Sequence, residues 1–127
     1  MIEEKKVSSE ETVLIGVVTQ HQDEEESNEY LDELEFLTLK AGGVAVKRFT
    51  QKLEKPNPKT FIGAGKLEEV KAYMDTHKIE TAIFDDELSS SQLRNIEKVL
   101  NCKVLDRTNL ILDIFATRAR TIESRLQ

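Results

Sequence analysis

The segment Thr60-Phe61-Ile62-Gly63-Ala64-Gly65-Lys66 combines residue types that could bind a phosphate group. Its pattern predicts a short strand at Thr60–Ile62, a glycine-rich turn and the start of a helix. In such a turn the backbone N–H groups converge, and the helix N-terminus and a lysine add positive charge. Gly63, Gly65 and Lys66 are therefore the candidate nucleotide-binding residues.

The match of this segment to a P-loop is incomplete. The first glycine of the GxxxxGK[ST] motif would fall at Thr60, and the residue after Lys66 is Leu67, which cannot ligate Mg²⁺. We therefore favour a tight turn from strand to helix, in which the glycines permit close packing. Nucleotide binding is kept as the alternative.

A second candidate site consists of acidic residues that follow expected strands. Asp85-Asp86-Glu87 follows the apolar run Thr81–Phe84, and Asp106 follows Cys102–Leu105. Ligands of open α/β sheets bind at the carboxyl ends of strands, and clustered carboxylates can hold Mg²⁺. Acidic residues are also favourable at helix starts and in solvated turns, which is the interpretation we favour.

Eight basic residues form two clusters that could contact RNA phosphates. One cluster surrounds a loop that contains both prolines, and the other lies on the last predicted helix. A solvated loop and a solvated helix face are the structural alternative, which we favour on the residues alone. The candidate RNA-contact residues are Lys47, Arg48, Lys52, Lys55, Lys59, Arg118, Arg120 and Arg125.

No catalytic residue and no metal site is assigned. His21 and His77 stand apart from any cysteine or paired acidic residue, whereas a metal site needs several ligands at suitable spacing. The single cysteine, Cys102, cannot form a disulfide within the chain. A reduced, cytoplasmic setting is the simplest expectation.

Length and charge limit the possible classes of protein. The 127 residues are enough for one domain with its own core, and the net charge is −6. The charge is uneven: residues 1–40 carry −9, residues 41–102 carry +1 and residues 103–127 carry +2. The chain is thus not a generic basic binder of nucleic acid. No apolar run approaches the roughly 20 residues that a membrane span requires.

Apolar patterning predicts an α/β fold with a mostly parallel sheet of four or five strands flanked by helices. Residues 1–11 are expected to form a flexible tail, and residues 12–107 an α/β domain. The expected strands are Thr12–Thr19, Val44–Phe49, Thr60–Ile62, Thr81–Phe84 and Cys102–Leu105. The expected helices are Ser27–Ala41, Lys66–His77, a helix capped by Ser89 with Gln92 in a capping box, and a last one capped by Thr108.

The last predicted helix, residues 108–127, carries apolar residues with offsets of three and four. This pattern is typical of a helix that packs along another helix. No glycine, asparagine or proline ends the helix, so we expect the chain to be the front part of a longer protein. The apolar seam consists of Leu112, Phe115, Ala119, Ile122 and Leu126.

Several motifs together resemble the N-terminal domain of the HflX family of GTPases. The resemblance covers roughly Leu14 to Gln127, and its motifs occur in the family's order. They are Pro56–Lys66, Phe84–Ser89, Gln92–Glu97, Val104–Thr108, Leu110–Ala116, Arg118–Thr121 and Leu126-Gln127.

This resemblance implies an α/β subdomain, then a helical hairpin whose start would be residues 108–127, and then a GTPase domain. It implies that the whole protein hydrolyses GTP with Mg²⁺ in that further domain and acts on stalled or idle ribosomes. The implied partners are the large ribosomal subunit, with its RNA, and the protein's own GTPase domain. No cofactor is expected in this chain itself, although the family's link to ATP makes Gly63, Gly65 and Lys66 the positions to test.

Two alternatives remain open on the residues alone. The first is a free-standing α/β nucleotide-binding or phospho-receiver-like domain with Asp85 and Asp86 as its acidic site. A receiver needs further acidic residues after its first strand, where this chain has Thr19-Gln20-His21. The second is an interaction domain that dimerises through the apolar seam of the last helix.

Overall fold

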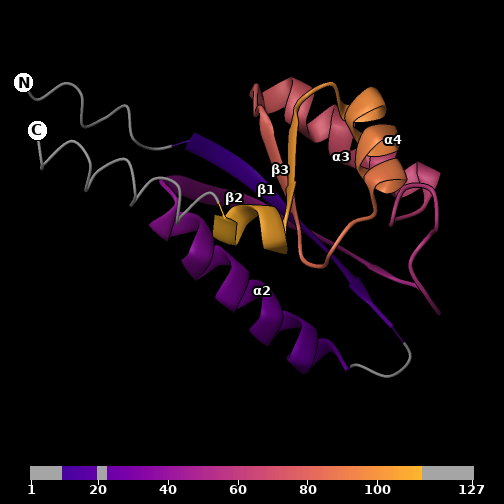
Figure 1. The fold of residues 1–127 in the computed structure, drawn as a ribbon, viewed down its shortest axis with the longest axis horizontal. Helices are drawn as coiled ribbons and strands as arrows, with labels where there is room; N and C mark the ends of the chain where they lie inside the picture. The colour runs from indigo at the N-terminus through magenta and orange to yellow at the C-terminus, as the bar shows by residue number, and fades with distance from the viewer. Residues whose placement is uncertain (1–9, 20–22, 113–127) are drawn as a thin grey trace, which may run out of the picture.

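The computed structural model describes residues 10–19 and 23–112, and it shows a parallel sheet between helices (Figure 1). The strands are β1 (Glu10–Val18), β2 (Gly43–Lys52), β3 (Thr81–Phe84) and β4 (Lys103–Asp106). The helices are α2 (Glu24–Lys40), α3 (Ala64–His77) and α4 (Ser90–Leu100), and residues 107–112 are helical as well.

The four strands form one sheet in the order β2-β1-β3-β4, and all three strand pairs are parallel. The predicted fold class is confirmed. The chain leaves β1 toward β2 on one side and later returns through α3 to β3 on the other side. The strand order therefore reverses between β1 and β3, which is where open α/β sheets bind ligands.

The sheet is covered on both faces, as expected for parallel strands. α2 and the helical residues 107–112 lie on one face, and α3 and α4 lie on the other (Figure 1). Successive residues of β1 alternate between these two cores. Leu14 packs with Leu31, Leu34 and Leu110, and Ile15 belongs to the larger cluster on the α3 and α4 side.

Local caps explain where the helices begin. Ser89 and Gln92 form the predicted capping box at the start of α4. Asp23 and Glu26 form a second capping box, so α2 begins at Glu24 and not at Ser27. The capping box satisfies two backbone N–H groups that a helix start otherwise leaves without partners.

Two local predictions were wrong. Thr60–Ile62 is not a strand, because only an isolated antiparallel bridge joins Phe61 to Asn57. The last helix is capped by Asp106 and not by Thr108, since the Asp106 carboxylate accepts from the N–H of Asn109 at 2.8 Å. The helix therefore begins two residues earlier than a cap at Thr108 would place it.

The remaining differences concern element boundaries. β2 extends to Lys52, three residues past the predicted end. Glu10 and Glu11, expected in the tail, begin β1. Most of the predicted apolar seam of the last helix lies outside the described residues, and its first member, Leu112, is exposed. None of the helices in the described ranges is long and apolar enough to cross a membrane.

Two glycines offer a matched test of packing. A Cβ at Gly43 would lie 3.0 Å from Thr38 Cγ2 and 3.3 Å from the backbone oxygen of Glu10, whereas a Cβ at Gly65 would meet nothing within 4 Å. We expect Gly43→Ala to destabilise the fold by about 1 to 2 kcal/mol, as overpacked sites do. We expect Gly65→Ala, in the first turn of α3, to stabilise it by about 0.5 kcal/mol. Urea unfolding measures both, and equal stabilities would contradict the assigned packing.

The half-buried Cys102 offers a second test, because it packs against the core on the α3 and α4 side. Burial raises the pKa of its thiol to about 11. Since the thiolate is the reactive form, alkylation by iodoacetamide at pH 8 should be about a hundredfold slower than for an unperturbed cysteine. The rate should rise to that of a free cysteine in urea, and a fast reaction of the folded protein would contradict the burial.

Candidate functional site at the carboxyl edge of the sheet

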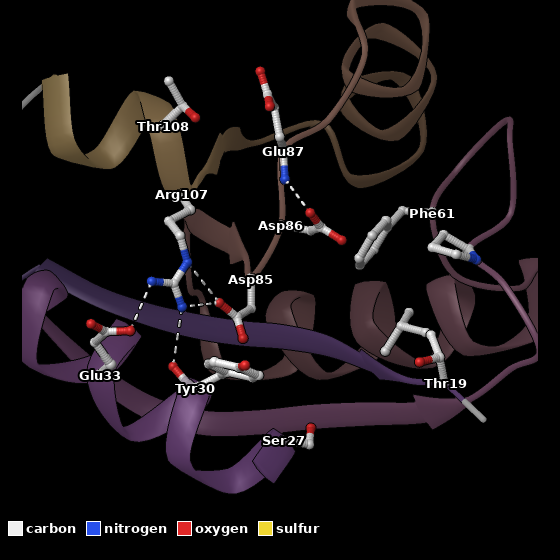
Figure 2. Close-up of a pocket in the computed structure, with 12 residues that line it drawn as sticks. Thr19, Ser27, Tyr30, Glu33, Phe61, Asp85, Asp86, Glu87, Arg107 and Thr108 are labelled. Atoms are coloured by element: carbon white, nitrogen blue, oxygen red, sulfur yellow. Dashed lines mark hydrogen bonds and ion pairs between the residues drawn. The ribbon is translucent and has the colours of Figure 1, made fainter. Parts of the chain in front are cut away.

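A pocket of about 640 Å³ lies at the carboxyl edge of the sheet. Thr19 follows β1, Asp85 follows β3 and Arg107 follows β4, so the pocket opens where the strand order reverses (Figure 2). It is lined by Val17, Thr19, Ser27, Tyr30, Glu33, Pro56, Phe61, Asp85, Asp86, Glu87, Arg107 and Thr108.

Arg107 ties three elements together at one wall of this pocket (Figure 2). Its Nη2 and Nε donate to Asp85 Oδ1 at 2.5 and 3.1 Å, and its Nη1 donates to Glu33 Oε1 at 3.0 Å. Nη2 also donates to the backbone oxygen of Tyr30 at 3.4 Å. The guanidinium therefore links the ends of β3 and β4 to helix α2.

The Asp85 carboxyl and the Arg107 guanidinium affect each other's ionisation. The side chain of Asp85 is 9% exposed and that of Arg107 27% exposed. Burial raises the pKa of the Asp85 carboxyl above its ordinary value, although Arg107 opposes this rise. Burial lowers the pKa of the Arg107 guanidinium, but its hydrogen bonds to Asp85 and Glu33 outweigh that effect, so the net shift is upward. The guanidinium thus stays charged and favours an ionised Asp85.

The loop 56–62 forms the opposite wall and is held in an unusual conformation. Phe61 has a positive φ of 68°; the residue is 2% exposed, and its ring packs edge-on against Phe84. Such a backbone is unfavourable for a bulky residue and persists only where surrounding contacts maintain it. Here Asn57 and Phe61 exchange two backbone hydrogen bonds of 2.8 and 2.9 Å.

Helix α4 provides the other contacts of this loop. Gln92 Nε2 donates to the backbone oxygen of Asn57 at 2.8 Å, and Asn95 Nδ2 donates to that of Lys59 at 3.0 Å. The two sequence motifs that contain these residues are therefore in direct contact. Their shared role is to hold the loop against the sheet.

The predicted nucleotide-binding residues lie beside this loop and do not line the pocket. Gly63 is the N-cap residue of α3, and its N–H donates to Gln51 Oε1 at 2.8 Å. Lys66 forms an exposed ion pair with Glu69 at 3.2 Å. Gly65 has open space around its Cα. Nucleotide binding by these residues stays a prediction.

The predicted RNA-contact residues differ in their surroundings. Arg48 is engaged by Asp32 and Glu35 at 2.6 and 2.8 Å, and Lys47 lies over the rings of Phe49 and Tyr73. The remaining three, Lys52, Lys55 and Lys59, are exposed around the end of β2 and the loop that follows it. Arg118, Arg120 and Arg125 lie outside the described residues.

The acidic residues do not gather as a metal-binding group. Asp106 is buried and accepts from the backbone N–H of Leu88 and of Asn109, so it acts as a structural cap. Asp85 is paired with Arg107. Within residues 10–19 and 23–112 no three His, Cys, Asp or Glu side chains could hold a metal ion together.

The sequence analysis did not assign Ser27, Tyr30, Glu33 or Arg107 to a site. Arg107 follows a strand, as Asp85 does, so the parallel sheet itself could have brought these two residues together. Nothing in the helical pattern of α2 distinguishes Ser27, Tyr30 and Glu33 as lining residues. Their position depends on how α2 packs across the sheet.

Comparison with known proteins places these residues in a family. The GTP-binding GTPase N-terminal family matches residues 28–116. GTPase HflX of Flavobacterium psychrophilum is 58% identical over all 127 residues, and GTPase HflX of Escherichia coli is 41% identical over 121 residues, 94% of the chain. The chain belongs to the N-terminal family of HflX GTPases. It spans 31% of the first relative's length and 28% of the second's.

Solved structures of GTP-binding proteins share the fold of this chain. The SsGBP and GDP complex superposes with a TM-score of 0.65 at 26% identity, over 84% of this chain and 29% of that one. A GTP-binding protein from Sulfolobus solfataricus in complex with GDP gives 0.62 at 25% identity, over 84% and 30%. The resemblance deduced from the ordered motifs is thus confirmed.

The pair of Arg107 and Asp85 gives a pH-dependent prediction. Arg107→Met should destabilise the protein by about 3 kcal/mol at pH 7, because it leaves a buried carboxylate without its partner. Without the cation the pKa of Asp85 rises further, so the destabilisation is smallest at low pH, where Asp85 is protonated, and grows as the pH rises through that pKa. Urea unfolding of Arg107→Met at pH 4.5 and 7 measures this difference.

The double variant Arg107→Met with Asp85→Asn is the control for this prediction. It removes the unpaired carboxyl, so it should recover part of the lost stability and abolish the extra pH dependence. A double variant that is as unstable as Arg107→Met at both pH values would show that packing, and not charge, is responsible.

Proposed function

We propose that this chain is the regulatory and ribosome-docking domain of an HflX-type GTPase. The observation that carries the proposal is the family match over residues 28–116, together with relatives named GTPase HflX that are about three times as long. In the whole protein, GTP and Mg²⁺ would bind in a further domain. The described part of the chain would orient that domain and contact the large ribosomal subunit during action on stalled or idle ribosomes.

The exposed lysines support a contact with RNA. Lys52 is the last residue of β2, Lys55 and Lys59 lie in the loop 53–60, and each of the three is exposed. None of the three side chains forms an ion pair within the described ranges. Because Arg48 and Lys47 already have partners on the domain surface, these three are the cations best placed to neutralise phosphates.

Co-sedimentation with large ribosomal subunits tests the proposal. The full-length protein should lose binding when residues 1–105 are removed. In the intact protein, Lys52→Gln, Lys55→Gln and Lys59→Gln combined should weaken binding and reduce the slope of log affinity against log salt by about 2.

A matched control uses three lysines at the other end of the sheet. Lys78, Lys98 and Lys103 are exposed and lie near the amino ends of β3 and β4. Their combined change to glutamine removes the same charge and should leave ribosome binding almost unchanged. Equal binding with and without residues 1–105 at matched salt would refute a docking role, and equal effects of both triple variants would refute the assigned surface.

A further inference from the structure

We propose that the pocket at the carboxyl edge of the sheet binds an organic cation, an ammonium or guanidinium group. This inference concerns the residues that line the pocket and is independent of the ribosome-docking proposal. It begins from two polar atoms that belong to largely buried side chains and line the pocket, and whose bonding capacity the described residues leave unused.

The first of these atoms is the hydroxyl oxygen of Ser27. The residue is 6% exposed and lines the pocket, yet its hydroxyl makes no hydrogen bond within residues 10–19 and 23–112. Figure 2 shows the hydroxyl turned toward the space that Tyr30 and Thr19 flank. Since no buried side-chain nitrogen or oxygen of the described residues lacks a partner, this hydroxyl is accessible from the pocket and is available to a ligand group there.

The second atom is Oδ2 of Asp85. Both hydrogen bonds from Arg107 go to Oδ1, and Oδ2 accepts none from the described part of the chain. The side chain is 9% exposed, and in Figure 2 its second oxygen points toward Tyr30. A carboxylate oxygen can only accept, so the group that satisfies it must be a donor.

The net charge of the residues that line the pocket indicates which kind of hydrogen-bond donor can bind there. Four carboxylates (Glu33, Asp85, Asp86 and Glu87) and one guanidinium line the pocket, which leaves a formal net charge of −3. The guanidinium of Arg107 is already bound to Asp85 and Glu33. A phosphate would therefore meet repulsion, whereas a cation would be attracted and could form charge-assisted hydrogen bonds.

The aromatic lining favours an organic cation over a metal ion. Tyr30 lines the pocket and is 44% exposed, so an aromatic ring is accessible there. The faces of such rings attract ammonium and guanidinium groups. A volume of about 640 Å³ also exceeds what a bare metal ion needs, and it suits a small amine or the side chain of a lysine or arginine.

The test is titration of the 127-residue chain, followed by amide NMR shifts. The probes are agmatine and the blocked peptide Gly-Arg-Gly, with Gly-Gln-Gly as the neutral peptide control. We expect agmatine or Gly-Arg-Gly to shift the amides of Ser27, Tyr30 and Phe61. Tighter binding of agmatine indicates a small free amine as the ligand, and tighter binding of the peptide indicates a protein side chain; either result supports the proposal.

Three variants show whether the pocket itself is responsible. Asp86→Asn should weaken the better probe about fivefold by removing one charge. Ser27→Ala should weaken it about threefold with no change in net charge, because the hydroxyl would bond to the ligand. Glu68→Gln, an exposed change on α3 away from the pocket, should have no effect on binding.

Three outcomes would overturn the proposal. The first is the absence of shifts at the pocket with 10 mM of either cationic probe. The second is an equal effect of Glu68→Gln and Asp86→Asn, which would indicate attraction to the overall negative charge. The third is competition for the same amides by ATP or GTP, which would show that the pocket accepts anions.

Discussion

The burial of β1 on both faces and the pairing of both its edges determine the organisation of this domain. Leu14 and Ile15 point into different cores, and each is fully buried. β2 and β3 lie on either side of the strand, and both pairs are parallel. A parallel arrangement brings the carboxyl ends of the strands to one edge, so the residues that follow β1, β3 and β4 must lie close together.

That edge carries the polar contacts that the family motifs encode. Asp106 caps the last helix and holds the backbone of Leu88, while Arg107 binds Asp85 and reaches α2. Gln92 and Asn95 hold the loop that contains Phe61. These motif residues therefore have structural roles. They position a loop, a helix start and two strand ends around the pocket.

Acidic and basic side chains lie on different parts of the domain surface. The acidic side chains of α2 pair with Arg48 on one flank and Arg107 on the other. The pocket has a negative lining, whereas Lys52, Lys55 and Lys59 are exposed around the loop after β2. A net charge of −6 is thus compatible with a local basic surface. The two surfaces favour ligands of opposite charge, an anion at the loop and a cation in the pocket.

The sequence by itself determined the order of the main elements, the parallel sheet, the capping box at Ser89 and the family. These features depend on apolar periodicity and on contacts between residues a few positions apart. Only the tertiary structure decided that Thr60–Ile62 is a strained loop, that Asp106 and not Thr108 caps the last helix, and that Arg107 meets both Asp85 and Glu33. It also placed Ser27 and Tyr30 in the pocket. Those features depend on how α2 and α4 pack across the sheet, and local sequence patterns carry little information about contacts between distant segments.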